Sequence, residues 1–176
     1  MVSGPFLFME LLPLFLKLAG RRVVLVGTGP LATAKLDALV RAGADVRLVA
    51  PEAFQPADLD EAWLVVSAAP AAINRQVADA AEARRIFVNA VDDPPNASAY
   101  LGGVIRRAGV TIAISTSGEA PALAGVLREG IDALLPADLD RWTACARDLR
   151  QTWKADGVPM EDRRPQLIDA LKGLYP

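Results

Sequence analysis

The apolar residues of this chain fall into short runs, separated by longer stretches in which they recur every three or four positions. The short runs are typical of strands in a parallel sheet that is buried on both faces, and the longer stretches have the period of a helix. The predicted strands cover residues 22–27, 45–50, 62–68 and 86–91, and the predicted helices between them cover residues 31–41 and 73–85. Because strands and helices alternate, we expect an α/β fold with right-handed crossovers.

The pattern changes after residue 103. Apolar residues on both sides of Ala108-Gly109 indicate a hairpin instead of another strand–helix–strand unit. A helix is expected to begin at Pro121, because proline is tolerated in the first turn. Apolar residues recur at helical spacing after Asp138, and a last helix is predicted over residues 166–174. The sequence thus predicts three parts, which cover residues 1–103, 104–136 and 137–176.

An apolar stretch from Pro5 to Gly20 raises the question of a signal peptide or a membrane anchor. It has no basic residue at its start, and polar residues and a proline interrupt it. It is also shorter than the roughly 20 apolar residues that a spanning helix needs. We therefore expect Leu11 to Leu18 to form a short buried segment leading into the first strand, and the protein to be cytoplasmic, without a membrane partner.

Composition narrows the range of functions further. Hydrophobic residues make up 52% and charged residues 23% of the 176 residues, which is typical of a packed core. The net charge of −2 gives no basic surface for nucleic acid. Cys145 is the single cysteine, so no internal disulfide can form, as expected in a reducing compartment. The chain has no histidine, which excludes histidine-ligated metal sites and histidine-dependent nucleophilic catalysis, and no metal site is predicted.

The strongest chemical signal is a glycine-rich turn between the first predicted strand and the first predicted helix. Its sequence, Gly27-Thr28-Gly29-Pro30-Leu31-Ala32, matches G-x-G-x-x-A. The first glycine allows a tight turn, the second lets a pyrophosphate approach the backbone, and the alanine lets the helix close onto the strand. The helix N-terminus then offers unpaired N–H groups to phosphates. In this setting we expect a Rossmann-type dinucleotide site; the alternative is a purely structural turn.

Glu52 follows the second predicted strand, about 20 residues beyond the turn, where a carboxylate can accept hydrogen bonds from a ribose. No arginine lies within residues 50–55 to hold a 2′-phosphate, so NAD is favoured over NADP as the cofactor. Ala53 and, after the third strand, Ala69 complete the predicted cofactor contacts. The alternative is that Glu52 only solvates a turn after Pro51.

A second polar group, Asn89 to Pro95, follows the fourth predicted strand. In open α/β sheets the carboxyl ends of the strands face the ligand crevice. A carboxylate at this position can take a proton or stabilise positive charge beside a nicotinamide. Asp92 and Asp93 are both candidates, and either could instead cap a turn before the two prolines. The residues alone leave these possibilities open.

Five blocks of sequence lie in order between Leu11 and Leu135. They are residues 12–18 leading into the glycine turn, 48–52, 74–92 with a gap at 79–83, 112–116 and 121–124. Together these blocks resemble the precorrin-2 dehydrogenase domain of siroheme synthases, and several blocks in register are much more specific than a glycine motif. Some members of that family also act as sirohydrochlorin ferrochelatases.

The resemblance implies that NAD removes a hydride from precorrin-2, an anionic tetrapyrrole, to give sirohydrochlorin. It places the family's key aspartate on Asp92, as a general base or essential acid/base group. It implies that Ser115, Thr116, Ser117 and Gly118 line the substrate cleft, and that the protein is a homodimer with residues 104–136 as its dimerisation segment. Five arginines are available to meet substrate carboxylates, although each could equally be a surface charge. They are Arg84, Arg85, Arg106, Arg107 and Arg128.

The chain also departs from the family pattern. Residues 68–72 contain only alanine and proline where relatives usually carry a threonine and acidic residues, and the segment between Pro51 and Leu59 is short. Three functions therefore stay open. The first is an NAD-dependent precorrin-2 dehydrogenase, and the second is ferrochelatase activity in the same cleft, with Asp92 taking pyrrole protons. The third is an NAD-binding regulatory or scaffold module with reduced or lost catalysis.

Overall fold

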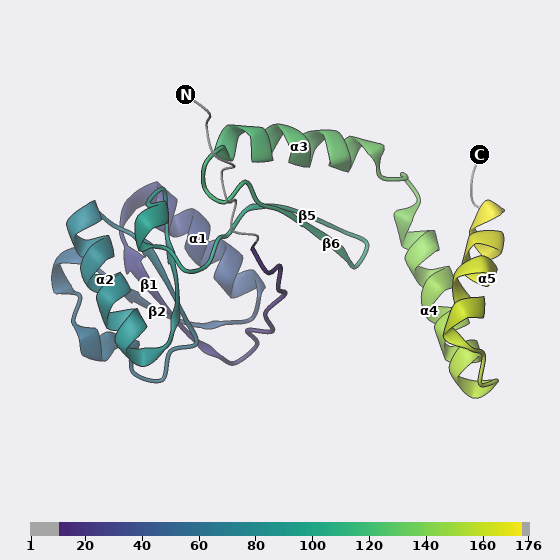
Figure 1. The fold of residues 1–176 in the computed structure, drawn as a ribbon, viewed down its shortest axis with the longest axis horizontal. Coiled ribbons are helices and arrows are strands. Elements are labelled where there is room, and N and C mark those ends of the chain that lie inside the picture. The colour runs from purple at the N-terminus through teal and green to yellow at the C-terminus, as the bar shows by residue number, and fades with distance from the viewer. Residues whose placement is uncertain (1–10, 174–176) are drawn as a thin grey trace, which may run out of the picture. The chain divides into compact units, whose positions relative to one another are not determined.

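The computed structural model describes residues 11–173 and divides into two compact units (Figure 1). The first unit contains the described residues up to Leu101 together with Ser117–Glu119. The second contains Gly102–Thr116 and the residues from Ala120 onward. The first unit is an α/β unit, and the second combines a hairpin with three helices.

The first unit is built on a four-stranded parallel sheet, as the sequence predicts. Its strands are β1 (Arg22–Gly27), β2 (Asp45–Val49), β3 (Leu64–Ala68) and β4 (Phe87–Ala90), in the order β2-β1-β3-β4. From β1 the chain passes to β2 on one side, and from β3 it passes to β4 on the other. The carboxyl ends of β1 and β3 therefore form the topological switch point, where such sheets bind ligands.

Two helices cover the two faces of this sheet (Figure 1). Helix α1 (Gly29–Arg41) contributes Leu39 to one buried cluster, and α2 (Ala71–Arg84) contributes Val77 to the other. The residues of β1 from Val23 to Val26 are fully buried, as a strand covered on both faces requires. Both helices begin two residues earlier than predicted. The first turn of α1 includes Gly29 and Pro30, because proline fits a position whose N–H has no partner within the helix.

Short 3-10 helices lie in the connections between these elements. They are η1 (Pro51–Ala53), η2 (Pro56–Leu59) and η3 (Pro94–Asn96), and each begins with a proline. In η2, the buried carboxylate of Asp58 pairs with Arg47 of β2 and accepts a hydrogen bond from the Gln55 N–H. These bonds fix the short connection between β2 and β3.

The prediction of a buried segment over Leu11 to Leu18 is wrong in this chain. Only Leu18 is buried, at 7% exposure, whereas Leu12 and Phe15 are 80% and 70% exposed. The segment forms no helix or strand, and Leu18 reaches the core because the turn after it hydrogen-bonds to its carbonyl. Residues 5–10 of the apolar stretch lie outside the described residues. Within residues 11–173, none of the helices has the length and apolar character that a membrane crossing requires.

The second unit begins with the predicted hairpin, β5 (Gly103–Arg107) paired antiparallel with β6 (Val110–Ile114). Both turn residues, Ala108 and Gly109, have positive φ, as a two-residue hairpin turn demands. Helix α3 (Pro121–Leu134) packs on the hairpin and buries Ala124.

Helices α4 (Leu139–Ala155) and α5 (Met160–Lys172) pack against each other. The indole N–H of the buried Trp153 donates a 2.6 Å hydrogen bond to Gln166. Helix α5 begins six residues before the predicted start. Pro165, the residue before that predicted start, lies inside the helix. The predicted last residue of this helix, Leu174, lies outside the described residues.

Candidate cofactor site

Gly27 closes the turn at the end of β1 against the neighbouring strand. A Cβ at this position would lie 2.8 Å from the Ala68 carbonyl oxygen and 3.2 Å from the Ala32 Cβ. Its φ of +155° is also one that residues with a side chain rarely adopt. Gly27 and Ala32 are therefore small because β1, β3 and the start of α1 approach each other closely at the switch point.

Gly29 has a different role in the same turn. Its φ is +78°, and a Cβ there would meet no atom within 4 Å. The glycine is thus required by the backbone conformation, and the space beside it is open. Thr28 is the N-cap residue but its side chain makes no capping hydrogen bond, and the first turn of α1 contains no acidic residue. N–H groups at this helix start have no internal acceptors, so the turn offers the geometry and positive potential of an anion site.

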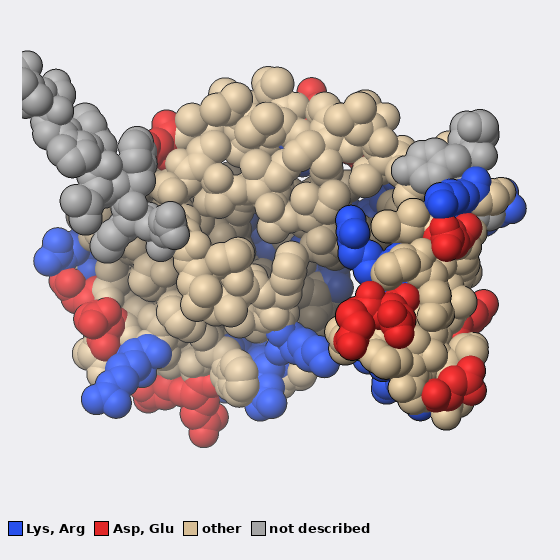
Figure 2. All heavy atoms as spheres, turned by 45° about the vertical axis from the view of Figure 1, so that its right-hand side comes forward, with Lys and Arg blue, Asp and Glu red and all other residues tan. Residues whose placement is uncertain are grey.

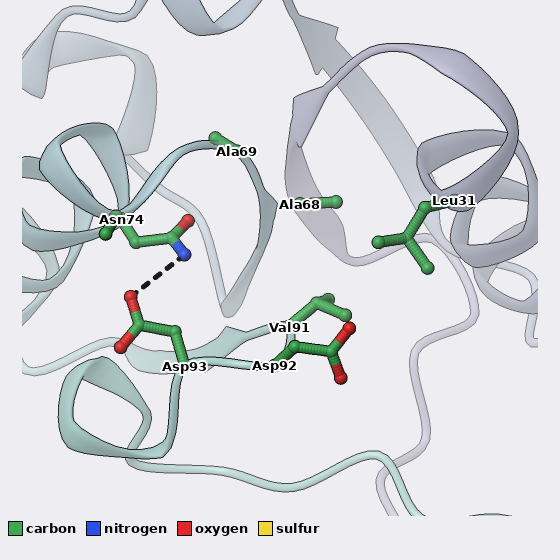
Figure 3. Close-up of a pocket in the computed structure, with 8 residues that line it drawn as sticks. Leu31, Ala68, Ala69, Asn74, Val91, Asp92 and Asp93 are labelled. Atoms are coloured by element: carbon green, nitrogen blue, oxygen red, sulfur yellow. Dashed lines mark hydrogen bonds between the residues drawn. The ribbon is translucent and has the colours of Figure 1, made fainter.

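A cavity of about 450 Å³ opens at the carboxyl ends of the strands in the first unit. Figure 3 shows its lining, which combines the start of α1, the loop after β3 and the loop after β4. Three residues predicted from the sequence, Leu31, Ala69 and Asp92, line it together. Its full lining is Leu31, Ala68, Ala69, Ala71, Asn74, Val91, Asp92 and Asp93.

The two adjacent aspartates after β4 have different surroundings. Asp93 accepts hydrogen bonds from the side-chain amides of Asn74, at 3.0 Å, and Asn96, at 2.9 Å. Asp92 has a left-handed backbone with φ +55°, and its exposed carboxylate points away from that of Asp93 (Figure 3). Within residues 11–173 the Asp92 carboxylate has no hydrogen-bond or ion-pair partner. Of the two carboxylates, Asp92 is therefore the one free to meet a ligand.

A buried polar pair, Ser67 and Asn74, supports this loop and was not predicted from the sequence. The two residues are 0% and 2% exposed, and the Ser67 hydroxyl donates to the Asn74 side-chain oxygen at 2.7 Å. The Ser67 carbonyl accepts the Val91 N–H at 2.8 Å. The available signal was a hydroxyl and an amide interrupting an apolar strand and an alanine-rich helix, because buried polar groups need partners.

Glu52 and Ala53 lie in η1, directly after β2. Both are exposed, and neither lines the cavity. Because β2 runs parallel to β1, with Val49 beside Val26, Glu52 lies at the same edge of the sheet as the glycine turn. An acidic side chain at this place can reach a ribose bound over the end of β1.

The predicted substrate loop, Ser115 to Gly118, is divided between the two units. Ser117 and Gly118 belong to the first unit, where a Cβ on Gly118 would lie 3.0 Å from the Pro94 ring and 3.2 Å from Tyr100. These two residues therefore pack beside the segment that carries Asp92. Thr116 belongs to the second unit, and its hydroxyl accepts the Ala120 N–H before α3.

The structure separates the five candidate arginines. Arg84 is the last residue of α2 and Arg85 follows it, at the amino edge of the sheet opposite the cavity. Arg84 pairs with Asp60 at 3.0 Å. In the second unit, Arg107 donates to the carbonyls of Asp132 and Pro136. Arg128 pairs with Glu129 at 2.9 Å, while Arg106 is exposed and has no ion-pair partner among the described residues.

Acidic residues and the cysteine are dispersed through the structure. No group of three or more histidine, cysteine, aspartate or glutamate side chains within residues 11–173 is arranged to hold a metal ion.

The parallel sheet, the glycine turn and the cavity at the switch point together define a Rossmann-type dinucleotide-binding protein. A family model described as "Putative NAD(P)-binding" matches residues 14–103, and the chain belongs to that family.

The comparisons also confirm the resemblance to siroheme synthases. Siroheme synthase 1 of Cronobacter sakazakii is 43% identical over 95% of this chain, and siroheme synthase of Photorhabdus laumondii is 37% identical over 95%. The chain spans 40% of the length of each of these relatives. A solved structure titled "SirC, precorrin-2 dehydrogenase" has the same fold, with a TM-score of 0.69 at 22% identity, over 90% of this chain and 88% of that chain.

Proposed function

We propose that this chain is an NAD-dependent dehydrogenase that oxidises precorrin-2 to sirohydrochlorin in siroheme biosynthesis. The observation that carries the proposal is the Asp92 carboxylate, which has no partner among the described residues and lines the cavity beside the glycine turn. The similarity to siroheme synthases, and to a structure titled as a precorrin-2 dehydrogenase, supports the choice of substrate.

The residues of the first unit fit a dinucleotide. The open space beside Gly29 and the acid-free start of α1 suit the diphosphate, and Glu52 is placed to accept hydrogen bonds from a ribose. Ala69 and Leu31 give the cavity an apolar wall beside Asp92. Because residues 50–55 contain no arginine, we propose NAD instead of NADP. When bound, NAD supplies the hydride acceptor for the reaction.

Asp92 then acts as the proton acceptor. Oxidation of precorrin-2 removes one hydride, which reduces NAD to NADH, and one proton, which the Asp92 carboxylate accepts and passes to solvent. An exposed carboxylate that is not hydrogen-bonded within residues 11–173 is suited to this exchange, since it does not have to break an existing bond there. Ser117 and Gly118, beside Pro94, are proposed to form part of the substrate side of the cavity.

We further propose that the protein is a homodimer assembled through residues 104–136. Within the described residues the hairpin pairs with no third strand, and an isolated two-stranded ribbon is only marginally stable. Helix α3 also exposes large apolar side chains, with Val126 at 65% and Leu134 at 84%. By contrast, α4 and α5 carry interspersed acidic and basic side chains on the face shown in Figure 2. An apolar helix face beside unpaired strand edges is typical of a surface that a second copy covers.

The direct test is incubation of the purified protein with NAD and precorrin-2. We expect the absorption spectrum of sirohydrochlorin and stoichiometric NADH. If the protein binds NAD in calorimetry but oxidises no precorrin-2, the non-catalytic NAD-binding module is favoured; its motivation is the apolar loop of Ala68, Ala69 and Ala71 in the cavity wall. Addition of Fe²⁺ to sirohydrochlorin tests ferrochelatase activity separately.

A further inference from the structure

The loop after β4 presents two carboxylates in succession, and only one of them accepts hydrogen bonds from the described residues. The Asp93 side chain turns toward α2 and accepts the Asn74 amide, whereas Asp92 faces the open cavity (Figure 3). The hydrogen bond spans 19 positions of the chain, so it joins the loop to a separate element. It lies one residue from the group proposed to accept the proton.

The burial and hydrogen bonds of Asn74 fix its side chain in place. It is 2% exposed, and both ends of its amide are engaged, since its oxygen accepts from Ser67 and its nitrogen donates to Asp93. Ser67, which donates to the Asn74 oxygen, is fully buried in β3, and its backbone carbonyl accepts the Val91 N–H. The chain Ser67–Asn74–Asp93 therefore ties β3, α2 and the loop after β4 to one another.

We propose that Asn74 is a positioning residue that selects Asp92 as the reacting carboxylate by holding Asp93 against α2. This inference deepens the proposed function and rests on it. With Asp93 fixed, the left-handed backbone at residue 92 directs its side chain the other way, into the cavity. Without Asn74, the Asp93 carboxylate loses its long-range partner and the loop loses its link to α2. A small displacement of a reacting group is enough to lower a rate strongly.

Four variants separate this role from a direct one. Asn74→Leu keeps the size of the side chain and removes both hydrogen bonds. Asp93→Asn keeps an oxygen that accepts from Asn74 and removes the negative charge. Asp92→Asn removes the proposed proton acceptor. Gln76→Leu, an amide lost from an exposed position of the same helix, is the matched control.

The experiment measures kcat with precorrin-2, the Kd of NAD by calorimetry, and amide hydrogen exchange in the absence of any ligand. We expect Asn74→Leu to lower kcat by about 10- to 100-fold with the Kd of NAD unchanged. We expect faster exchange at the Val91, Asn96 and Ala97 amides, which are hydrogen-bonded in this loop, with exchange in β1 as the internal reference. Gln76→Leu should keep both the activity and the exchange of the parent protein, and Asp93→Asn should lose much less activity than Asp92→Asn because it keeps an oxygen that accepts from Asn74.

Two results would overturn the proposal. The first is an Asn74→Leu protein with unchanged loop exchange and unchanged kcat. The second is an Asp93→Asn protein as inactive as Asp92→Asn, which would make Asp93 a reacting group. If the parent protein does not oxidise precorrin-2, the proposed function fails, while the exchange measurement still decides whether Asn74 holds the loop.

Discussion

The carboxylates of Asp92 and Asp93 are adjacent in the chain and point in different directions. Asp93 accepts two side-chain amides, and Asp92 faces a cavity of about 450 Å³ without a partner among the described residues. This difference depends on one left-handed residue and one hydrogen bond to α2. It gives a physical reason for favouring Asp92, a choice that the residues alone left open and that the family resemblance implied.

Asp92→Asn should remove most of the dehydrogenase activity while leaving the cofactor bound. The substitution keeps the size of the side chain but removes its ability to accept a proton, and general-base catalysis typically contributes about 10²- to 10⁴-fold. Initial rates of NADH formation give the loss, and calorimetry gives the Kd of NAD. A variant with parental kcat would reject Asp92 as the proton acceptor.

Glu52→Gln should weaken NAD binding, since a hydrogen bond to a charged acceptor contributes about 1.5–3 kcal/mol, or roughly a 10- to 100-fold change in Kd. The exposed position predicts no accompanying loss of stability. Glu82→Gln, on the exposed face of α2, is the matched control. Equal affinity of parent and Glu52→Gln for NAD would show that this carboxylate is only a solvent-exposed turn residue that does not contact NAD.

Gly27→Ala should destabilise the first unit. The new methyl group would lie 2.8 Å from the Ala68 carbonyl oxygen, and overpacking of this kind costs about 1–3 kcal/mol. Urea unfolding followed by circular dichroism measures the change in free energy of unfolding. A Gly27→Ala protein of parental stability would mean that β1 and β3 are farther apart at this point than the structure has them.

The dimer proposal predicts that the 18.7 kDa chain sediments at twice its mass. Val126→Glu places a charge on the exposed apolar face of α3 and should shift the protein toward the monomer, because an unpaired charge is costly to bury. Gln151→Glu, on the exposed surface of α4, controls for the added charge. Sedimentation equilibrium distinguishes the two forms, and a parent chain that stays monomeric at all concentrations contradicts the proposal.

The sheet and the glycine turn could be predicted from the sequence because each depends on local pattern. Runs such as Val23 to Val26 are apolar throughout, since both sheet faces are covered, and the turn follows directly from the strand. The start of α5 was misplaced because Pro165 is tolerated inside the helix. The exposure of Leu12 and Phe15 was missed because hydrophobicity alone does not reveal whether a segment has anything to pack against.

Three of the residues that line the cavity, Leu31, Ala69 and Asp92, were predicted from the sequence, but the hydrogen bonds that hold the lining together were not. The residues at the carboxyl ends of the strands were expected to converge, because parallel strands end at one edge. The residues alone left Asp92 and Asp93 open, and the family resemblance chose Asp92. The physical cause of the difference was not accessible, since it requires Asn74, which comes from another element. The division of residues 115–118 between two units could not be predicted either, because it depends on the packing of Gly118 beside Pro94 and Tyr100.

The central claim is that the turn between β1 and α1 holds the diphosphate of NAD. Calorimetric titration of the parent protein and of Gly29→Val with NAD tests it most directly. A Cβ at residue 29 meets no protein atom within 4 Å, so the variant should lose only the roughly 1–2 kcal/mol of stability that a left-handed backbone costs. We expect saturable binding of NAD to the parent protein and loss of that binding in the folded variant. Equal binding of NAD to both proteins, or binding to neither, would contradict it.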